Sequence, residues 1–209
     1  AVDSFKGSAT SKEVEDYIEN GILRYKKDNI SIKKIPIADG GEGTVEAIVE
    51  ATSGEYKYLE VKGPLGNTVK AKFGIIKNIA VMEMAESSGI NLVPRESLNP
   101  YKATTYGVGQ ILKQILDMGI KEIYIGIGGS ATNDGGAGML AALGAKFYDS
   151  QNNEIGYTPI ELNKLSRIDL TTFDSRVAKT KITILSDVRN ILCGENGASY
   201  IYGPQKGAS

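Results

Sequence analysis

The chain has 209 residues, of which 41% are hydrophobic and 23% charged, a composition that supports one large or two small globular domains. Its 24 basic and 25 acidic residues leave a net charge of −1, which gives no electrostatic basis for binding nucleic acid or an anionic membrane. The sequence has no histidine, so serine–histidine triads, cysteine–histidine pairs and histidine-ligated zinc are excluded. Acid–base chemistry would then fall to Asp, Glu, Lys or Tyr, and a bound metal would be a hard cation held by oxygen.

The sequence contains no apolar run of the ~20 residues that a membrane-spanning helix needs, and the N-terminus lacks the pattern of a secretory signal. Its single cysteine, Cys193, has no partner for an internal disulfide, which suits a reducing compartment. We therefore expect a cytoplasmic protein with neither membrane nor nucleic-acid partners.

The first predicted element is an amphipathic helix over residues 10–27. Thr10 and Glu13 have the spacing of a capping box, and apolar residues follow at helical period. Residues 32–37, with isoleucine at 32, 35 and 37, predict a short apolar strand, in which Pro36 disfavours a central position in a sheet.

The loop Asp39–Thr44 carries three glycines and precedes a second predicted helix. The resulting order of helix, strand, glycine loop and helix is typical of α/β folds. The chain then changes character, and short turns join three strand-like segments: 56–61, 68–76 and 79–84. Turns that short predict antiparallel hairpins, since parallel strands need long crossovers. We place a domain boundary near Gly54, with residues 1–55 in one domain and 56–209 in the second.

Alternating strands and helices return from Thr104, where apolar residues line one face of a helix that stops at Gly119. The later predicted elements are a strand at 122–127, a glycine-rich loop at 128–136, a helix at 137–143, a polar hairpin or loop at 148–154 and a strand at 182–185.

The strongest local motif is the glycine-rich loop 128–136, which lies between a predicted strand and a predicted helix. Its glycines let backbone N–H groups approach an anion, and the helix N-terminus adds partial positive charge. The candidate anion-binding residues are Gly128, Gly129, Ser130, Thr132 and Asn133. Asp134 is a candidate Mg²⁺ ligand or acceptor of a hydroxyl proton. The loop has neither dinucleotide-binding nor Walker A spacing, and an ordinary turn capped by Asn133 or Asp134 is the alternative.

Further loops also carry polar residues that suit a ligand. These candidates are Ser4, Lys6, Asp39, Gly40, Gly41, Glu42, Asp187, Gln205 and Lys206. Taken singly, each loop is equally a capping turn or a solvated surface segment. Four loops carry an aspartate, at positions 3, 39, 134 and 187, and three of them follow predicted strands. Together they predict one polar site at the carboxyl edge of a sheet.

These motifs, in this order, resemble the bacterial type I glycerate kinase family over essentially the whole chain. The segments that carry the resemblance are Asp3-Ser4-Phe5-Lys6-Gly7-Ser8, Asp39-Gly40-Gly41-Glu42-Gly43-Thr44, Gly128-Gly129-Ser130-Ala131-Thr132-Asn133-Asp134-Gly135-Gly136 and Gly203-Pro204-Gln205-Lys206-Gly207-Ala208. The resemblance implies two α/β domains, a Rossmann- or flavodoxin-like part and a second mixed α/β domain, with the active site between them. It also implies transfer of the ATP γ-phosphate to D-glycerate, with Mg²⁺, in the cytoplasm.

The resemblance suggests roles for the candidate residues, and we expect Lys6, Asp134 and Asp187 to be catalytic. Lys6 and Lys206 would neutralise charge on the glycerate carboxylate or the γ-phosphate, while the loop 128–136 binds phosphate or substrate anion. Asp134 or Asp187 would orient the hydroxyl group or bind Mg²⁺, and the sequence does not decide between them.

Several properties stay open at this point: the position of the phosphate on the product, the domain that binds adenine, and the oligomeric state, a homodimer included. The alternative function is a non-catalytic module that binds a small carboxylate or a nucleotide.

The family also has a C-terminal portion with a Thr-Gly-Glu-Gly loop, which this sequence does not contain. The chain begins at Ala1 without methionine and ends at Ser209, directly after a glycine-bearing motif. We therefore expect the N-terminal portion of a longer enzyme, in which the absent part completes the domain formed by residues 1–55. These 209 residues alone would then be catalytically inactive.

Overall fold

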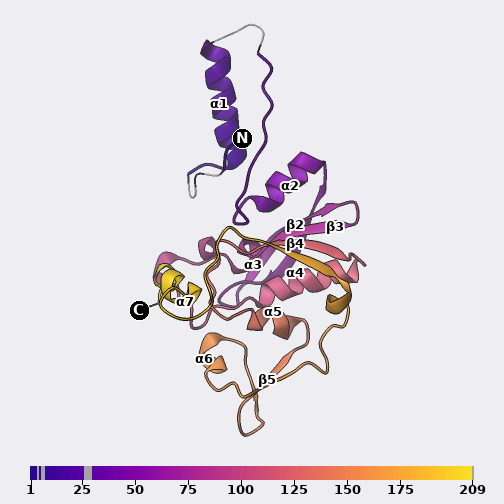
Figure 1. Ribbon diagram of the computed structural model, residues 1–209, viewed down its shortest axis with the longest axis vertical. Helices are drawn as coiled ribbons and strands as arrows, with labels where there is room; N and C mark the ends of the chain where they lie inside the picture. Colours follow the sequence, from indigo (N-terminus) through magenta and orange to yellow (C-terminus); the bar gives the residue numbers. More distant parts are fainter. Residues whose placement is uncertain (4, 6–7, 26–29, 209) are drawn as a thin grey trace.

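The computed structural model describes residues 1–3, 5, 8–25 and 30–208, and within them a mixed α/β fold is built around a five-stranded sheet (Figure 1). The sheet order is β1-β2-β3-β4-β8, with β1 at Glu55–Lys62, β2 at Thr68–Ile76, β3 at Ile79–Glu83, β4 at Glu122–Gly126 and β8 at Lys181–Leu185. The strands β1, β2 and β3 are antiparallel, whereas β3, β4 and β8 are parallel. The predicted α/β class and the predicted hairpins are both confirmed.

Helices cover both faces of this sheet. Side chains alternate between faces along a strand, so Met82 of β3 contacts the core beneath α4 (Tyr106–Asp117), while Val81 packs against α2 (Thr44–Thr52). The α4 core contains the fully buried side chains Phe73, Met82, Ile111, Leu112, Ile115 and Ile123. Burial of each such side chain contributes about 1.5–3 kcal/mol, which holds the parallel strands and their ends in place.

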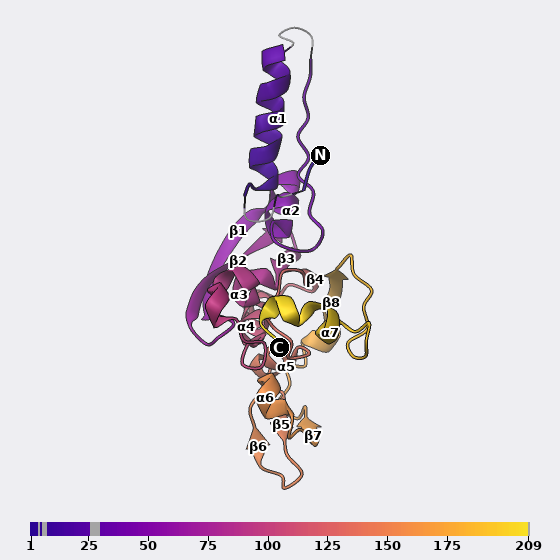
Figure 2. The same ribbon diagram turned by 90° about the vertical axis from the view of Figure 1, so that its left-hand side faces the viewer.

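Helix α1 (Ser11–Tyr25) and the segment 30–37 project away from the sheet beyond α2 (Figures 1 and 2). The predicted capping box is present, because Thr10 N–H donates to Glu13 Oε2 at 2.8 Å and Glu13 N–H donates to Thr10 Oγ1 at 3.2 Å. The predicted strand at 32–37 is wrong: among the described residues this segment makes one isolated bridge, between Val2 and Pro36. An apolar segment needs a neighbouring strand to form a ladder, and proline has no N–H to donate.

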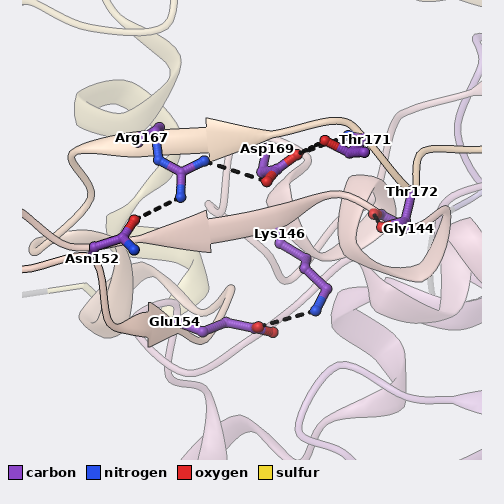
Figure 3. A network of polar contacts seen from close by, with 8 residues as sticks. All are labelled: Gly144, Lys146, Asn152, Glu154, Arg167, Asp169, Thr171 and Thr172. Carbon is purple, nitrogen blue, oxygen red and sulfur yellow. Dashed lines mark hydrogen bonds and ion pairs between the residues drawn. The ribbon is translucent and has the colours of Figure 1, made fainter.

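A second, smaller sheet lies at the opposite end of the molecule, with the order β6-β5-β7 (Figure 2). Its strands are β5 (Lys146–Tyr148), β6 (Glu154–Ile155) and β7 (Arg167–Asp169). Polar contacts cross its surface: Lys146 Nζ donates to Glu154 Oε2 at 3.2 Å, and Arg167 Nη2 donates to Asn152 Oδ1 at 2.8 Å (Figure 3). The predicted hairpin is confirmed, with Asn152 at φ 63° in its turn.

The remaining described elements are short connections around the two sheets. They are α3 (Ala85–Ser88), α5 (Ala137–Ala142), α6 (Pro159–Leu162), α7 (Ala198–Tyr202), and the 3₁₀ turns η1 (Ile90–Leu92), η2 (Arg95–Ser97), η3 (Val177–Lys179) and η4 (Pro204–Lys206). None of the helices in the described ranges combines the length and apolar character that crossing a membrane requires.

Helix α2 packs on the face of the central sheet, although it precedes the predicted domain boundary near Gly54. The helices predicted near residues 10, 104 and 137 are confirmed as α1, α4 and α5. The assignment of residues 1–55 and 56–209 to two domains stays a prediction.

Candidate functional site

The three parallel strands end in register at one edge of the central sheet. Glu83 of β3 pairs with Gly126 of β4, which in turn pairs with Leu185 of β8. Ligands of α/β proteins bind outside the carboxyl ends of such strands, where the loops that leave them converge. The predicted site is therefore expected at this edge of the sheet.

The glycine-rich loop that leaves β4 runs beside the segment that leaves β3. Ile90 N–H donates to Gly129 O at 2.8 Å, and Ala131 N–H donates to Ser88 O at 2.8 Å. These two hydrogen bonds fix the backbone of the glycine-rich loop against the segment that leaves β3. The side chain of Ser130 takes no part in them and remains available for contacts on the opposite side of the loop.

The loop 39–43 lies directly on the glycine-rich loop. Gly128 N–H donates to Gly40 O at 3.0 Å. Gly40 has φ 91°, and a Cβ there would lie 2.4 Å from Leu185 O. A Cβ at Gly126 would lie 2.5 Å from Gly40 O. Only glycine allows backbones to approach this closely, so the two glycine motifs form one packed unit across β4 and β8.

Lys206 of η4 reaches the glycine-rich loop from the C-terminal end of the chain. Its Nζ donates to Ser130 Oγ at 2.8 Å and to Thr132 O at 2.6 Å. Burial lowers the pKa of Lys206, and the nearby charge of Asp134 acts in the opposite direction. Ser199 Oγ donates to Asn133 Oδ1 at 3.0 Å, so α7 also contacts this loop. A half-buried ammonium group is thus held among hydroxyl and carbonyl oxygens beside a glycine loop.

Asp134 lies beneath the loop, with 5% of its surface exposed. Its Oδ2 accepts hydrogen bonds from Thr105 N–H and Thr105 Oγ1, both at 2.8 Å, and from Gly138 N–H at 3.1 Å. Its Oδ1 accepts from Gly136 N–H at 3.0 Å. These contacts tie the start of α5 to the start of α4 and favour a structural role. The predicted roles of Asp134 in metal binding and proton transfer stay predictions.

Asp187 follows β8 and is exposed, and Ser186 Oγ accepts a hydrogen bond from Val188 N–H at 3.3 Å. Asp39 and Asp187 line the same groove, about 540 Å³ in volume, between α2 and β8. Asp39 Oδ1 accepts a hydrogen bond from Gly41 N–H at 2.9 Å, which shapes the loop. The structure therefore brings two of the predicted carboxylates to one groove at the strand ends.

The other predicted residues are placed less centrally. Glu42 is exposed and accepts a hydrogen bond from Asn91 Nδ2 at 2.7 Å, while Gln205 is exposed on η4. Ser4 and Lys6 lie outside the described residues. No group of three or more acidic or cysteine side chains in the described part of the chain is arranged to hold a metal ion.

Glu83 is a residue of this edge that the sequence patterns did not indicate. It ends β3, is 1% exposed, and its Oε1 accepts a hydrogen bond from Val45 N–H at 2.5 Å. The only signal in the sequence was a glutamate at the end of an apolar strand, followed by Ser87, Ser88 and Gly89.

The fold and this edge define an α/β protein in which two glycine loops and a half-buried lysine meet at the carboxyl ends of parallel strands. The sequence matches the glycerate kinase family over residues 1–209, and the chain belongs to that family.

Several similar proteins are named as glycerate kinases. The chain is 48% identical over 211 residues to a glycerate kinase from Halalkalibacterium halodurans, and 48% identical over 211 residues to a glycerate 2-kinase from Escherichia coli strain K12. Each comparison covers 100% of this chain but 55% of the relative, so the chain spans about half the length of these curated proteins. The crystal structure of a Salmonella typhimurium LT2 protein described as glycerate kinase 2 has a TM-score of 0.85 and 47% identity. That comparison covers 99% of this chain and 56% of the other, and it confirms the family and the α/β class.

Proposed function

We propose that the protein carrying this chain is an ATP-dependent glycerate kinase, which transfers the γ-phosphate of ATP to D-glycerate. The observation that carries this proposal is the contact of Lys206 with Ser130 and Thr132 on the glycine-rich loop, in a chain of the glycerate kinase family. A fixed cation beside hydroxyl groups and a glycine loop suits an anionic substrate or a phosphate.

Phosphoryl transfer depends on positioning and on neutralising charge more than on covalent chemistry of the protein. Lys206 would bind an anionic oxygen of glycerate or of the γ-phosphate, with its Nζ oriented by Ser130 Oγ and Thr132 O. Asp134 would position the same loop from beneath by fixing the start of α5. Lys6 stays a candidate for a second cation at this site.

Mg²⁺ commonly binds one or two carboxylates together with phosphate oxygens, so a pair of acids in one groove fits it. Asp187, exposed in the groove that Asp39 also lines, is the residue that we assign to Mg²⁺. Asp134 fits less well, because its Oδ2 already accepts three hydrogen bonds. A bound Mg²⁺ would supply positive charge for the transferring phosphate.

The domain proposal is that residues 1–55 form part of a Rossmann-like domain completed by residues outside this chain. The relatives extend well beyond the matched region, and α1 exposes Ile18, Ile22 and Leu23, which supports such a covering partner. A homodimer is the other arrangement that would cover this face. We propose a cytoplasmic location, where ATP is available, and no activity for these 209 residues alone.

The test is ADP production by the full-length protein with ATP, Mg²⁺ and D-glycerate. We expect ADP to form only when glycerate is present, and phosphorus NMR of the product then gives the position of the new phosphate. Binding of ATP or glycerate without ADP formation would instead indicate a non-catalytic binding protein.

A pair of variants connects the activity to the site. Lys206→Met removes the cation and is expected to lower kcat/KM by about 10²- to 10³-fold, the usual range for losing one group that stabilises developing charge. Lys121→Met is the matched control, since Lys121 is exposed at the amino end of β4. Equal activity of the two variants would contradict the assigned role of Lys206.

A further inference from the structure

We propose that Glu83 is a positioning residue that fixes the start of α2, and with it the loop 39–43, against the end of β3. The inference rests on the proposed function only where it concerns turnover. Its structural part stands on the contacts of Glu83.

The side chain of Glu83 is directed by the alternation of β3. Val81 packs on α2, so Glu83, two residues later, extends to the same face of the sheet. There its Oε1 accepts a hydrogen bond from Val45 N–H at 2.5 Å. The first N–H groups of a helix have no partner within the helix, and Glu83 supplies one from another element.

This contact completes the attachment of the loop 39–43 to the sheet edge. Its Gly40 carbonyl accepts a hydrogen bond from Gly128 N–H, beyond β4, and Gly40 packs on Leu185 at the end of β8. Glu83 adds the connection to β3. All three parallel strands thus hold the loop, and losing one contact would let it move relative to Asp187 and the glycine-rich loop.

The neighbouring acidic residues have a cationic partner, whereas the buried carboxyl group of Glu83 does not. Glu46 of α2 and Glu86 of α3 both pair with Lys72 of β2, the latter at 3.4 Å between Glu86 Oε1 and Lys72 Nζ. Glu83 has no such partner in the described part of the chain, and its Oε2 has no hydrogen-bond acceptor or donor beside it.

Burial raises the pKa of Glu83 to about 8, opposed by the Val45 hydrogen bond and assisted by the charges of Glu46 and Glu86. At neutral pH the group is therefore largely an uncharged acid, which avoids burying a negative charge near those of Glu46 and Glu86. A glutamine has the same shape, is uncharged and keeps the oxygen that Val45 N–H needs.

Three substitutions in the full-length protein separate these features. Glu83→Gln keeps the acceptor without the charge, Glu83→Leu removes the acceptor, and Glu83→Asp withdraws the carboxyl group by one methylene. Glu86→Gln is the matched control, because it changes one charge of the same cluster without contacting Val45.

The direct readout is hydrogen–deuterium exchange of the peptide 39–49 at pH 7, measured by mass spectrometry. Protection of this peptide should fall about tenfold or more in Glu83→Leu and Glu83→Asp, as expected for losing one buried hydrogen bond, and stay within about twofold of wild type in Glu83→Gln and Glu86→Gln. If Glu83→Leu does not fold, Glu83→Asp decides. Unchanged protection in the aspartate variant overturns the proposal.

The second readout is turnover of glycerate. A displaced loop should lower kcat/KM by about 10- to 100-fold in Glu83→Asp, with Glu83→Gln near wild type at pH 7. Absence of glycerate turnover in the wild-type protein would refute the proposed function, while the exchange data would still decide the role of Glu83. Loss of turnover in Glu83→Asp with normal protection would show that Glu83 does not act by positioning the loop.

Discussion

Replacement of Asp134 by alanine should destabilise the protein strongly, because four hydrogen bonds end on this one carboxylate. Two come from Thr105, one from Gly136 and one from Gly138, at 2.8 to 3.1 Å. Each buried donor that loses its acceptor costs about 1–3 kcal/mol. Entry of water and rotation of the Thr105 hydroxyl will recover part of this, so we expect a loss of about 3–5 kcal/mol in the free energy of unfolding.

Asp134→Asn gives an intermediate case. It keeps one acceptor oxygen but turns an amide NH₂ group toward backbone donors, for which we expect a loss of about 2 kcal/mol. The measurement is urea-induced unfolding of the full-length protein followed by circular dichroism. Asp187→Ala is the control: Asp187 is exposed, and its removal should change the free energy of unfolding by no more than about 0.5 kcal/mol.

The outcome distinguishes a structural Asp134 from a purely chemical one. If the free energy of unfolding of Asp134→Ala lies within about 1 kcal/mol of wild type, the hydrogen bonds of Asp134 do not hold α4 and α5 together. A variant that keeps normal stability but loses all turnover would instead support the metal-binding or proton-accepting role expected from the sequence.

Three further predictions concern the same edge of the sheet. Gly128→Ala places a Cβ 2.8 Å from Gly41 Cα and should lower kcat/KM by about 10- to 100-fold, whereas Gly21→Ala, with nothing within 4 Å, should leave turnover unchanged in the same assay. Because burial lowers the pKa of Lys206 below 10.5, kcat/KM should fall as pH rises through that lowered value, and Lys206→Arg should move the fall to higher pH; an unchanged profile would contradict the role of Lys206. The raised pKa of Glu83, about 8 against 4.5 in the unfolded chain, means that the folded state holds a proton which the unfolded state has released. As the pH rises from 4.5 to 8, the free energy of unfolding of wild type should therefore fall relative to that of Glu83→Gln, by an upper limit on the order of 5 kcal/mol. Thermal unfolding at several pH values checks this, and an equal change of Tm with pH in the two proteins would refute it.

Much of the fold could be predicted because its signals are local. Short turns near Gly63 and Lys77 predicted the antiparallel strands, and the glycine-rich loop 128–136 was placed between the correct strand and helix. The segment 32–37 had an equally apolar pattern, but no neighbouring strand forms a ladder with it in the described residues. Apolar character specifies burial, and a strand also needs a partner for its backbone.

The site was predictable as a set of loops but not as a set of contacts. Lys206 and Ser130 are 76 residues apart, and no local pattern connects them. The motif around Asp134 has the same appearance whether its carboxylate meets a ligand or Thr105, which lies 29 residues earlier. Glu83 belonged to no motif, and its importance depends on the packing of α2 above β3.

The projection of α1 from the sheet also has a consequence for how the isolated chain would be cleaved by a protease. Its contacts with the segment 30–37 include exposed ion pairs of Lys34 with Asp16 and Glu19, which contribute little to stability in water. This region should open far more often than the core beneath α4, so trypsin should cut first after one of the basic residues between positions 24 and 34. The five-stranded sheet would then remain as the protease-resistant product. Slower cleavage near α1 would show that another surface covers this helix.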